Sequence, residues 1–241
     1  MVIPKGVTLL LLLSGSVLAI AQPGEFKSLF DGQSLDGWEG DGGVFRVADG
    51  AIVGGNLKAP IRKSEYLCNT HEYADFELRL SARIKGYKNA GVHFRSQRIP
   101  DTGDVAGYQA DMGFISGEWL MRLSDVQRAD TNRSYPLWGS LLDELRQGTS
   151  RYPDPALPFN IIAVADHDLI EQVLKRDGWN QVGVIAVGRR IELNLNGGVP
   201  TVEFFEEEEV PLSGLICLQL HQGDPSEVWY RDISIRELSA K

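Results

Sequence analysis

Two short stretches of this chain alternate apolar and polar residues one by one: N-A-G-V-H-F-R-S-Q (residues 89–97) and G-Y-Q-A-D-M-G (residues 107–113). Successive side chains of a β-strand point to opposite faces of the sheet, so each stretch predicts a strand with one apolar and one polar face. The side chains on the predicted apolar faces are Ala90, Val92, Phe94, Tyr108, Ala110 and Met112. The side chains on the predicted polar faces are His93, Arg95, Gln97, Gln109 and Asp111.

The residue types on these polar faces indicate a ligand site. Strands that merely face water usually carry Lys, Glu, Thr and Ser, whereas this set combines imidazole, guanidinium, amide and carboxylate groups. Gln219 and His221 continue the pattern in L-I-C-L-Q-L-H (residues 215–221). Such an inventory suits the binding of a polar ligand, and a solvated strand face is the alternative interpretation.

Short alternating segments separated by Gly, Asp, Asn and Pro recur along the chain and predict an all-β fold. Besides the two stretches above, strands are expected at residues 44–47, 51–53, 65–68, 76–84, 117–123, 181–187, 190–195, 201–205, 214–221 and 227–237. Asp49-Gly50 predicts a hairpin turn between two of them. One short helix is expected at residues 166–176, with acidic residues near its start and Lys175-Arg176 near its end. This pattern favours a sandwich or barrel in one domain over residues 22–241.

The first 21 residues resemble a signal peptide. Lys5 precedes a leucine-rich run, and Ala19-Ile20-Ala21 forms a small-x-small cleavage site. A membrane anchor needs about 20 apolar residues, but this run is interrupted at residues 14–16. We therefore expect an exported protein, periplasmic or extracellular, with no membrane span in the mature chain.

The formal net charge of −9 excludes the electrostatic footprint of a nucleic-acid or anionic-membrane binder. Neutral partners such as carbohydrates remain open. Cys68 and Cys217 are the two cysteines. A disulfide and two buried thiols are both consistent with their number in an exported domain of this size.

Eight residues lie on the polar faces of their predicted strands: Glu77, Arg79, His93, Arg95, Gln109, Asp111, Gln219 and His221. If these strands are neighbours in one sheet, about 5 Å apart, their side chains form a contiguous polar face. Asp143 and Glu144 form an acidic pair within residues 129–158, an aperiodic segment expected to be a long functional or mobile loop. For that pair, a solvated helix end is the alternative interpretation.

Several blocks in order resemble the 3-keto-disaccharide hydrolase domain family. They are F-K-S-L-F-D-G-Q-S-L-D-G-W (26–38), Y-A-D-F-E-L-R-L (73–80), N-A-G-V-H-F-R-S (89–96), G-Y-Q-A-D-M-G (107–113), G-S-L-L-D-E (139–144), V-G-R-R-I-E-L-N-L-N-G (187–197), G-L-I-C-L-Q-L-H (214–221) and Y-R-D-I-S-I-R-E-L (230–238). The resemblance implies a concanavalin A-like jelly-roll of two antiparallel sheets. It also implies a sugar substrate, a disaccharide or glycoside already oxidised to a ketone at C3.

Such a substrate is cleaved by removal of the C2 proton, loss of the group at C1 and addition of water. Our hypothesis makes His221 the general base and Arg95, or a bound divalent cation, the stabiliser of the enolate. Asp111, Gln109 and Glu77 would position hydroxyls or hold that cation. His93 is the alternative base or a metal ligand. The remaining substrate-binding candidates are Asp143, Glu144 and Gln219.

Two other functions compete with this hypothesis. An ordinary glycosidase needs two carboxyl groups flanking one bond, but the E-x-D-x-(x)-E strand signature of glucanases is missing from the sequence. A noncatalytic carbohydrate-binding module would present exposed aromatic platforms. Trp119, Trp138 and Trp229 are the candidates for such platforms, although burial in the core is expected for Trp229.

Overall fold

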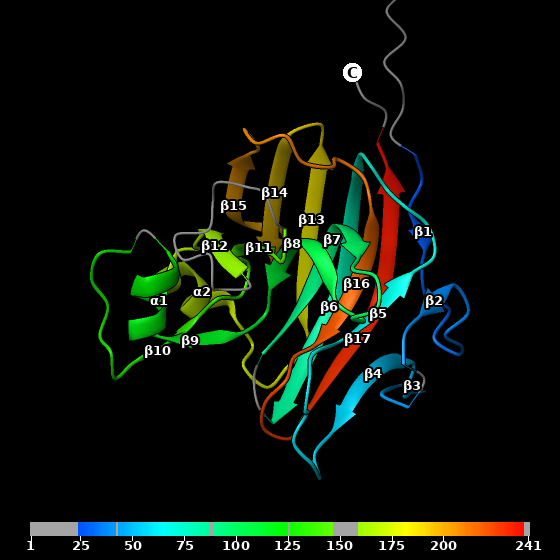
Figure 1. Cartoon of the computed structure of the whole chain (residues 1–241), viewed down its shortest axis with the longest axis horizontal. Coiled ribbons are helices and arrows are strands. Elements are labelled where there is room, and N and C mark those ends of the chain that lie inside the picture. The colour runs from blue at the N-terminus through cyan, green and yellow to red at the C-terminus, as the bar shows by residue number, and fades with distance from the viewer. Residues whose placement is uncertain (1–23, 42, 87–88, 125, 147–158, 239–241) are drawn as a thin grey trace, which may run out of the picture.

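Two antiparallel sheets packed face to face form the body of the protein (Figure 1). The structure, a computed structural model, describes residues 24–41, 43–86, 89–124, 126–146 and 159–238. The first sheet has the order β15 (Val199–Phe205), β14 (Arg190–Leu195), β13 (Asn180–Val187), β6 (Phe76–Gly86), β17 (Ser226–Glu237), β4 (Ala51–Asn56) and β3 (Phe45–Ala48), with β1 (Lys27–Ser28) paired to β17. The second has the order β12 (Phe159–Ala163), β11 (Leu141–Glu144), β8 (Val105–Asp111), β7 (Ala90–Arg98), β16 (Leu215–Leu220), β5 (Glu65–Asn69) and β2 (Trp38–Glu39). The predicted β-sandwich is confirmed.

Two helices and a small two-stranded sheet gather at the β11–β12 edge (Figure 1). They are α1 (Gly117–Leu123), α2 (His167–Val173), β9 (Phe114–Ser116) and β10 (Ser134–Pro136). α2 confirms the predicted helix, and the Asp166 side chain caps it by accepting the N–H groups of Asp168 and Leu169. The prediction of a strand at residues 117–123 is wrong. Ser116 accepts the N–H of Trp119 and starts α1, so the described residues contain two helices rather than one.

The segment predicted as a long loop, residues 129–158, contains β10 and β11. Residues 141–144 are therefore a buried strand between β8 and β12, not an irregular connection or a helix end. Residues 147–158 and the predicted signal peptide lie outside the described residues. Neither α1 nor α2 has the length and apolar character that crossing a bilayer requires.

The predicted apolar faces of β7 and β8 do face the core between the sheets. Val92, Phe94, Tyr108 and Ala110 are fully buried there. The Phe94 ring stacks on Tyr108 with centroids 5.5 Å apart and meets the Phe76 ring of the opposite sheet edge-on. Burial of these side chains stabilises the sandwich by about 25 cal/mol for each Å² of apolar surface removed from water.

The hairpin between β3 and β4 confirms the turn predicted from Asp49-Gly50. Both residues have positive φ angles, 49° and 69°. Two successive left-handed residues match the right-handed twist of the paired strands. Asparagine, aspartate and glycine adopt this conformation at the least cost, which is why the dipeptide is informative.

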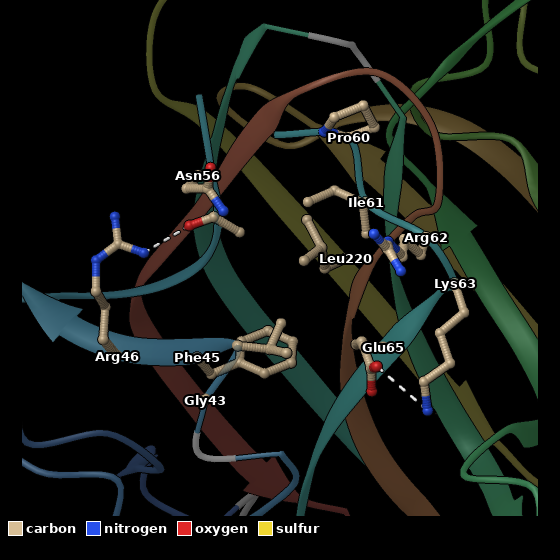
Figure 2. Close-up of a pocket in the computed structure, with 12 residues that line it drawn as sticks. Gly43, Phe45, Arg46, Asn56, Pro60, Ile61, Arg62, Lys63, Glu65 and Leu220 are labelled. Carbon is tan, nitrogen blue, oxygen red and sulfur yellow. Dashed lines mark hydrogen bonds and ion pairs between the residues drawn. The ribbon is translucent and has the colours of Figure 1, made fainter. Parts of the chain in front are cut away.

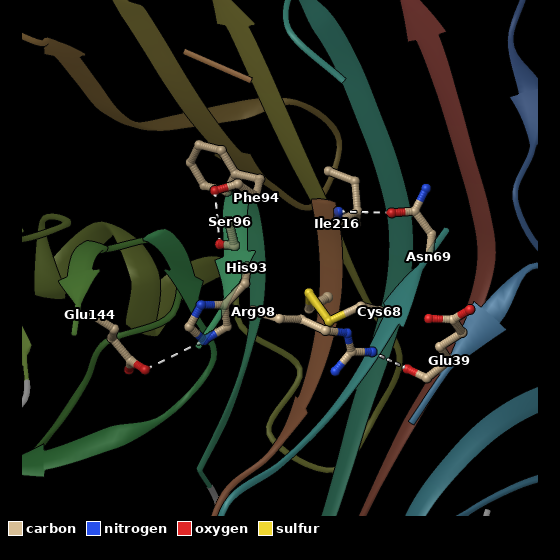
Figure 3. The surroundings of a disulfide bond; sticks show 10 residues. Glu39, Cys68, Asn69, His93, Phe94, Ser96, Arg98, Glu144 and Ile216 are labelled. Atoms are coloured by element: carbon tan, nitrogen blue, oxygen red, sulfur yellow. Dashed lines mark hydrogen bonds and ion pairs between the residues drawn. A yellow bond between two sulfur atoms is a disulfide. The ribbon is translucent and has the colours of Figure 1, made fainter. Parts of the chain in front are cut away.

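Cys68 and Cys217 form a disulfide between neighbouring strands of the second sheet (Figure 3). They are direct partners in the β5–β16 register and are fully buried. The bond spans 149 residues of sequence. Of the two alternatives left open by the sequence, the structure has the disulfide.

Arg95 lies on the opposite side of β7 from the predicted polar face. The register of β7 against β8 shifts between Phe94 and Gln97, and Arg95 has a φ of 48°. This irregularity changes the side-chain parity after Phe94. The fully buried guanidinium donates to the carbonyl oxygens of Ala74 (2.8 Å) and Gly188 (2.6 Å). Its predicted role as enolate stabiliser is therefore wrong, because Arg95 joins the two sheets instead.

Replacing Arg95 with methionine is expected to destabilise the fold by at least about 3 kcal/mol, because the carbonyl groups of Ala74 and Gly188 and the Asp75 carboxylate lose their buried donor. Urea denaturation followed by circular dichroism measures this loss. Arg98→Met is the matched control, since Arg98 is exposed on the same strand, and its effect should stay below about 1 kcal/mol. Equal stabilities of the two variants would contradict this structural role.

Candidate active site

The polar face of the second sheet borders a cavity of about 730 Å³. Its polar lining includes Tyr66, Gln109, Asp111, Glu144, Gln219 and His221. They come from β5, β8, β11, β16 and the turn after β16. The structure thus brings together five predicted site residues: Gln109, Asp111, Glu144, Gln219 and His221.

Gly91 makes room for this cluster in the middle of the sheet. It pairs with Asp111 of β8 on one side and with Gln219 of β16 on the other. A Cβ atom at Gly91 would lie 2.3 Å from Cδ of Gln109, so the absence of a side chain lets Gln109 lie over β7. Gln109 Nε2 then donates to Asp111 Oδ2 at 3.0 Å, and Gly113 N donates to Asp111 Oδ1. These bonds fix the orientation of the Asp111 carboxyl group.

Burial favours the protonated form of both carboxyl groups in the cavity. It raises the pKa of Asp111 to about 7, against the opposing effect of the hydrogen bonds from Gly113 and Gln109. It also raises the pKa of Glu144 to about 8, and the negative charges of Asp111 and Asp143 add to this shift. Two carboxyl groups that exchange protons near neutral pH are suited to acid–base chemistry.

His93 lies beneath this cluster. It pairs with Gln109 on one side and Cys217 on the other, and it is fully buried. Its Nε2 is 3.5 Å from Glu144 Oε2 (Figure 3). Burial lowers the pKa of His93 to about 3, so the ring is neutral at physiological pH. Its predicted contact with substrate is wrong, because His93 does not line the cavity, although its ring contacts Glu144 and Tyr66, which do.

His221 follows the last residue of β16 and lines the cavity. Its Nδ1 is 2.5 Å from the carbonyl oxygen of Gln222. A carbonyl oxygen can only accept a hydrogen bond, so this contact places the proton on Nδ1 and leaves Nε2 in its basic form. Burial lowers the pKa of His221, which keeps the ring neutral at pH 7.

Tyr66 is a site residue that the sequence analysis missed. Gln219 Nε2 donates to its hydroxyl oxygen at 3.4 Å, and burial raises the pKa of the phenol. The hydroxyl therefore keeps its proton and can donate it. The register of β5 against β16 brings Tyr66 beside Gln219. That pairing of strands distant in sequence carries no local signal, although residues 65–68 are a recognisable strand.

Glu77 and Arg79 lie far from this cavity, on β6 of the other sheet. Glu77 Oε1 accepts from Arg79 Nε at 2.8 Å, and Arg236 is its second partner. The prediction that Glu77 binds substrate beside Asp111 is wrong. Parity identified the polar face of each strand but not the sheet to which the strand belongs.

Asp143 and Glu144 are consecutive residues of β11, so their side chains point to opposite faces of the sheet. Glu144 faces the cavity, whereas Asp143 is fully buried on the other face of β11. Asp143 Oδ2 is 3.5 Å from Arg146 Nη1, and the Arg146 guanidinium covers the Tyr108 ring at 4.1 Å. The predicted substrate contact of Asp143 is therefore wrong.

A second cavity of about 660 Å³ opens at the end of the sandwich (Figure 2). Arg46 lies on one side of it and Arg62 and Lys63 on the other, around the apolar side chains of Phe45 and Leu220. Its carboxylate, Glu65, pairs with Lys63 at 3.3 Å. The described residues that line this cavity include the Asn56 amide but no histidine, tyrosine or second carboxyl group, in contrast to the first cavity.

The donor set does not fit the predicted divalent cation. Across the described ranges, no group of three or more His, Cys, Asp or Glu side chains is arranged to hold a metal ion. The cavity instead offers carboxyl groups, amides, a phenol and an imidazole, which bind and exchange protons without a metal.

Residues 25–236 match the family described as the 3-keto-alpha-glucoside-1,2-lyase-like domain. The chain belongs to this family.

Solved structures agree on the jelly-roll fold of this lyase-like domain. A Parabacteroides distasonis protein provisionally named a glycosyl hydrolase is 18% identical, with a TM-score of 0.59 over 89% of this chain and 94% of that one. The carbohydrate-binding module CBM66 of Bacillus subtilis is 13% identical, with a TM-score of 0.54 over 83% and 96%. The exoplasmic domain of VIP36 bound to Ca²⁺ and Man3GlcNAc is 12% identical, with a TM-score of 0.56 over 90% and 92%.

No curated protein matches the chain. At these low identities the structural matches establish the fold alone. Membership of the lyase-like domain family supports a carbohydrate-related function.

The buried His93 predicts a specific acid sensitivity. An unfolded histidine binds a proton below about pH 6.5, whereas folded His93 does so only near pH 3. The unfolded state thus gains protons first, and stability should fall by roughly 1.4 kcal/mol per pH unit as pH decreases between these values. His93→Gln should remove this contribution, which urea denaturation at pH 7.5 and 4.5 measures. His71→Gln, at an exposed histidine, is the control, and equal acid losses in wild type and His93→Gln would refute the assignment.

Proposed function

We propose that this protein cleaves glycosides that carry a ketone at C3, by removing the C2 proton, eliminating the C1 substituent and adding water. The observation that supports this function is the buried set of acid, base and hydrogen-bonding groups in one cavity of a lyase-like domain. Each stage of the reaction transfers a proton. The cavity holds groups that are protonated at neutral pH and a histidine that is unprotonated there.

The ketone makes this route possible. Removal of the C2 proton leaves an electron pair that is delocalised onto the C3 oxygen as an enolate. The enolate collapses to a C1=C2 double bond and expels the C1 oxygen substituent, which takes up a proton as it leaves. Water then adds across the double bond, with hydroxyl on C1 and hydrogen on C2. The sum is hydrolysis without net oxidation, so it requires proton donors and acceptors.

His221 is the proposed base for the C2 proton. Its Nδ1–H bond to Gln222 keeps Nε2 as a proton acceptor, and its lowered pKa keeps it unprotonated at neutral pH. A base of this kind is most effective when it is neutral at the working pH.

Glu144 and Tyr66 are the proposed donors. With a pKa of about 8, Glu144 holds a proton at neutral pH and can deliver it to the departing oxygen. The Tyr66 hydroxyl accepts from Gln219 and hydrogen-bonds Glu144, and with substrate bound it is proposed to donate its proton in a hydrogen bond to the enolate oxygen. Donors aimed at a developing oxyanion in a desolvated site lower the barrier substantially. Tyr66 takes the role that the sequence analysis gave to Arg95.

Asp111, Gln109 and Gln219 are proposed to hold the sugar hydroxyl groups. The amide oxygens of Gln109 and Gln219 are buried and accept no hydrogen bond from the residues that the structure describes. Buried polar atoms usually find a partner, so these two oxygens are ready acceptors for ligand hydroxyl groups. Asp111 is held in place by Gln109 and adds a third acceptor.

An ordinary glycosidase is the second candidate, because the cavity holds two carboxyl groups and the charge of Asp111 raises the pKa of Glu144. Such an enzyme would use one carboxyl group as acid and the other as base or nucleophile on an unoxidised sugar. A noncatalytic module would bind sugar without releasing product. Comparison of oxidised and unoxidised substrates separates all three functions.

Wild-type protein should release the aglycone from a 3-keto-glucoside and leave the matching unoxidised glucoside intact, with product followed by chromatography. His221→Ala should lower kcat by about 100-fold or more, since a lost general base costs this much, and circular dichroism should show an intact fold. Parallel reactions with a chelator report any metal requirement. Cleavage of the unoxidised glucoside would favour the glycosidase, and near-normal rates in His221→Ala would exclude that base.

The proton on Glu144 predicts the alkaline side of the pH profile. Because the raised pKa of about 8 keeps Glu144 protonated at lower pH, kcat/KM should fall as pH rises through this value. Protonation of His221 should lower it at acidic pH, and because burial lowers the pKa of His221 this acid decline lies below the ordinary range of histidine. Glu144→Gln should be slower and should lack the alkaline decline. Glu118→Gln, at an exposed carboxylate on α1, is the control, and an unchanged alkaline decline in Glu144→Gln would refute its role as the acid.

A further inference from the structure

One wall of the same cavity is apolar. It is built by the small sheet, the helix α1 and the β11–β12 edge, which lie together on one side of the sandwich (Figure 1). Its side chains are Phe114, Ile115, Trp119, Leu142, Leu145 and Phe159. Tyr66 and His221, which are assigned to proton transfer, stand on or directly after other strands, whereas Glu144 belongs to β11 like Leu142. The cavity is therefore divided into a polar part and an apolar part.

Trp119 is the most exposed member of this wall, with 43% of its surface accessible. α1 holds it in place, because Leu120 is fully buried behind the helix and a Cβ at Gly117 would lie 2.2 Å from the Asp130 oxygen. The Arg122 guanidinium lies 4.8 Å from the centre of its ring. A fixed, exposed indole inside a cavity is a surface on which a flat apolar ligand group can stack.

A second sugar fits this wall poorly. Its hydroxyl groups would lose water and meet hydrocarbon, which is unfavourable unless hydrogen bonds replace those to water. Ser116, which also lines the cavity, already uses its hydroxyl to accept the N–H of Trp119. An apolar group would instead gain by removing part of this apolar surface from water.

We propose that the leaving group of the substrate is an apolar, preferably aromatic, aglycone that binds against Trp119 and this wall. The inference rests on the proposed function, since it assigns the aglycone of that reaction. The sugar ring occupies the polar part of the cavity, and the C1 oxygen lies at the boundary between the two parts. Burial of one phenyl group at this wall should improve kcat/KM by about 10- to 100-fold.

The test uses ethyl and 2-phenylethyl 3-keto-glucosides of the same anomer. Both release a primary alcohol, so they differ in apolar bulk and hardly in leaving-group chemistry. Wild-type protein should prefer the phenylethyl substrate by at least tenfold in kcat/KM, and Trp119→Ala should reduce this preference at least fivefold. Phe205→Ala, at an exposed aromatic residue on β15 outside the cavity, is the matched control and should keep the wild-type preference.

Equal kcat/KM values for the two substrates, or a faster reaction with a 3-keto-disaccharide, would overturn the aglycone subsite while leaving the proposed reaction in place. If none of these compounds is cleaved, the proposed function fails, and binding decides the subsite separately. In calorimetry with the unoxidised glucosides, at least tenfold tighter binding of the phenylethyl compound that is lost in Trp119→Ala would support the subsite. Equal affinities, or no binding of either compound, would overturn it.

Discussion

The dry interface between the two sheets is the constraint on which the site depends. Val92, Phe94, Tyr108 and Ala110 must fill that interface, and each occupies every second position of its strand. The residues between them are then forced to the outer face of the sheet. Gln109 and Asp111 reach the cavity for this reason, without any local motif that would place them there. The same alternation of side chains therefore decides which residues pack in the core and which reach the site.

Desolvation gives the cavity its chemical character. Removal from water disfavours charge, so it raises the pKa values of Asp111 and Glu144 and lowers those of His93 and His221. The two carboxyl groups therefore titrate near neutral pH, whereas the two histidines stay unprotonated there. A set of ordinary side chains becomes able to hold and accept protons near neutrality. Neutral groups also suit a neutral sugar, since they bind its hydroxyl groups without attracting counterions.

The sequence was most informative where structure is local. Alternation identified β6, β7, β8, β13, β14 and β17, and Asp49-Gly50 identified a turn, because strand faces and left-handed turns are properties of neighbouring residues. It failed where the answer depends on partners distant in the chain. The sheet to which Glu77 belongs is set by the pairing of β6 with β13 and β17, and Tyr66 enters the site through the pairing of β5 with β16. Arg95 was misplaced because one irregular step in β7 reversed the parity.

The bond between Cys68 and Cys217 closes a covalent ring that contains every strand from β6 to β15. The segments before Cys68 and after Cys217 are the two free arms of this ring, and they lie side by side where β17 pairs with β4. A protease that cuts the backbone once anywhere inside the ring opens it but releases no fragment. The nicked chain stays a single molecule of unchanged mass, apart from one added water, until the disulfide is reduced.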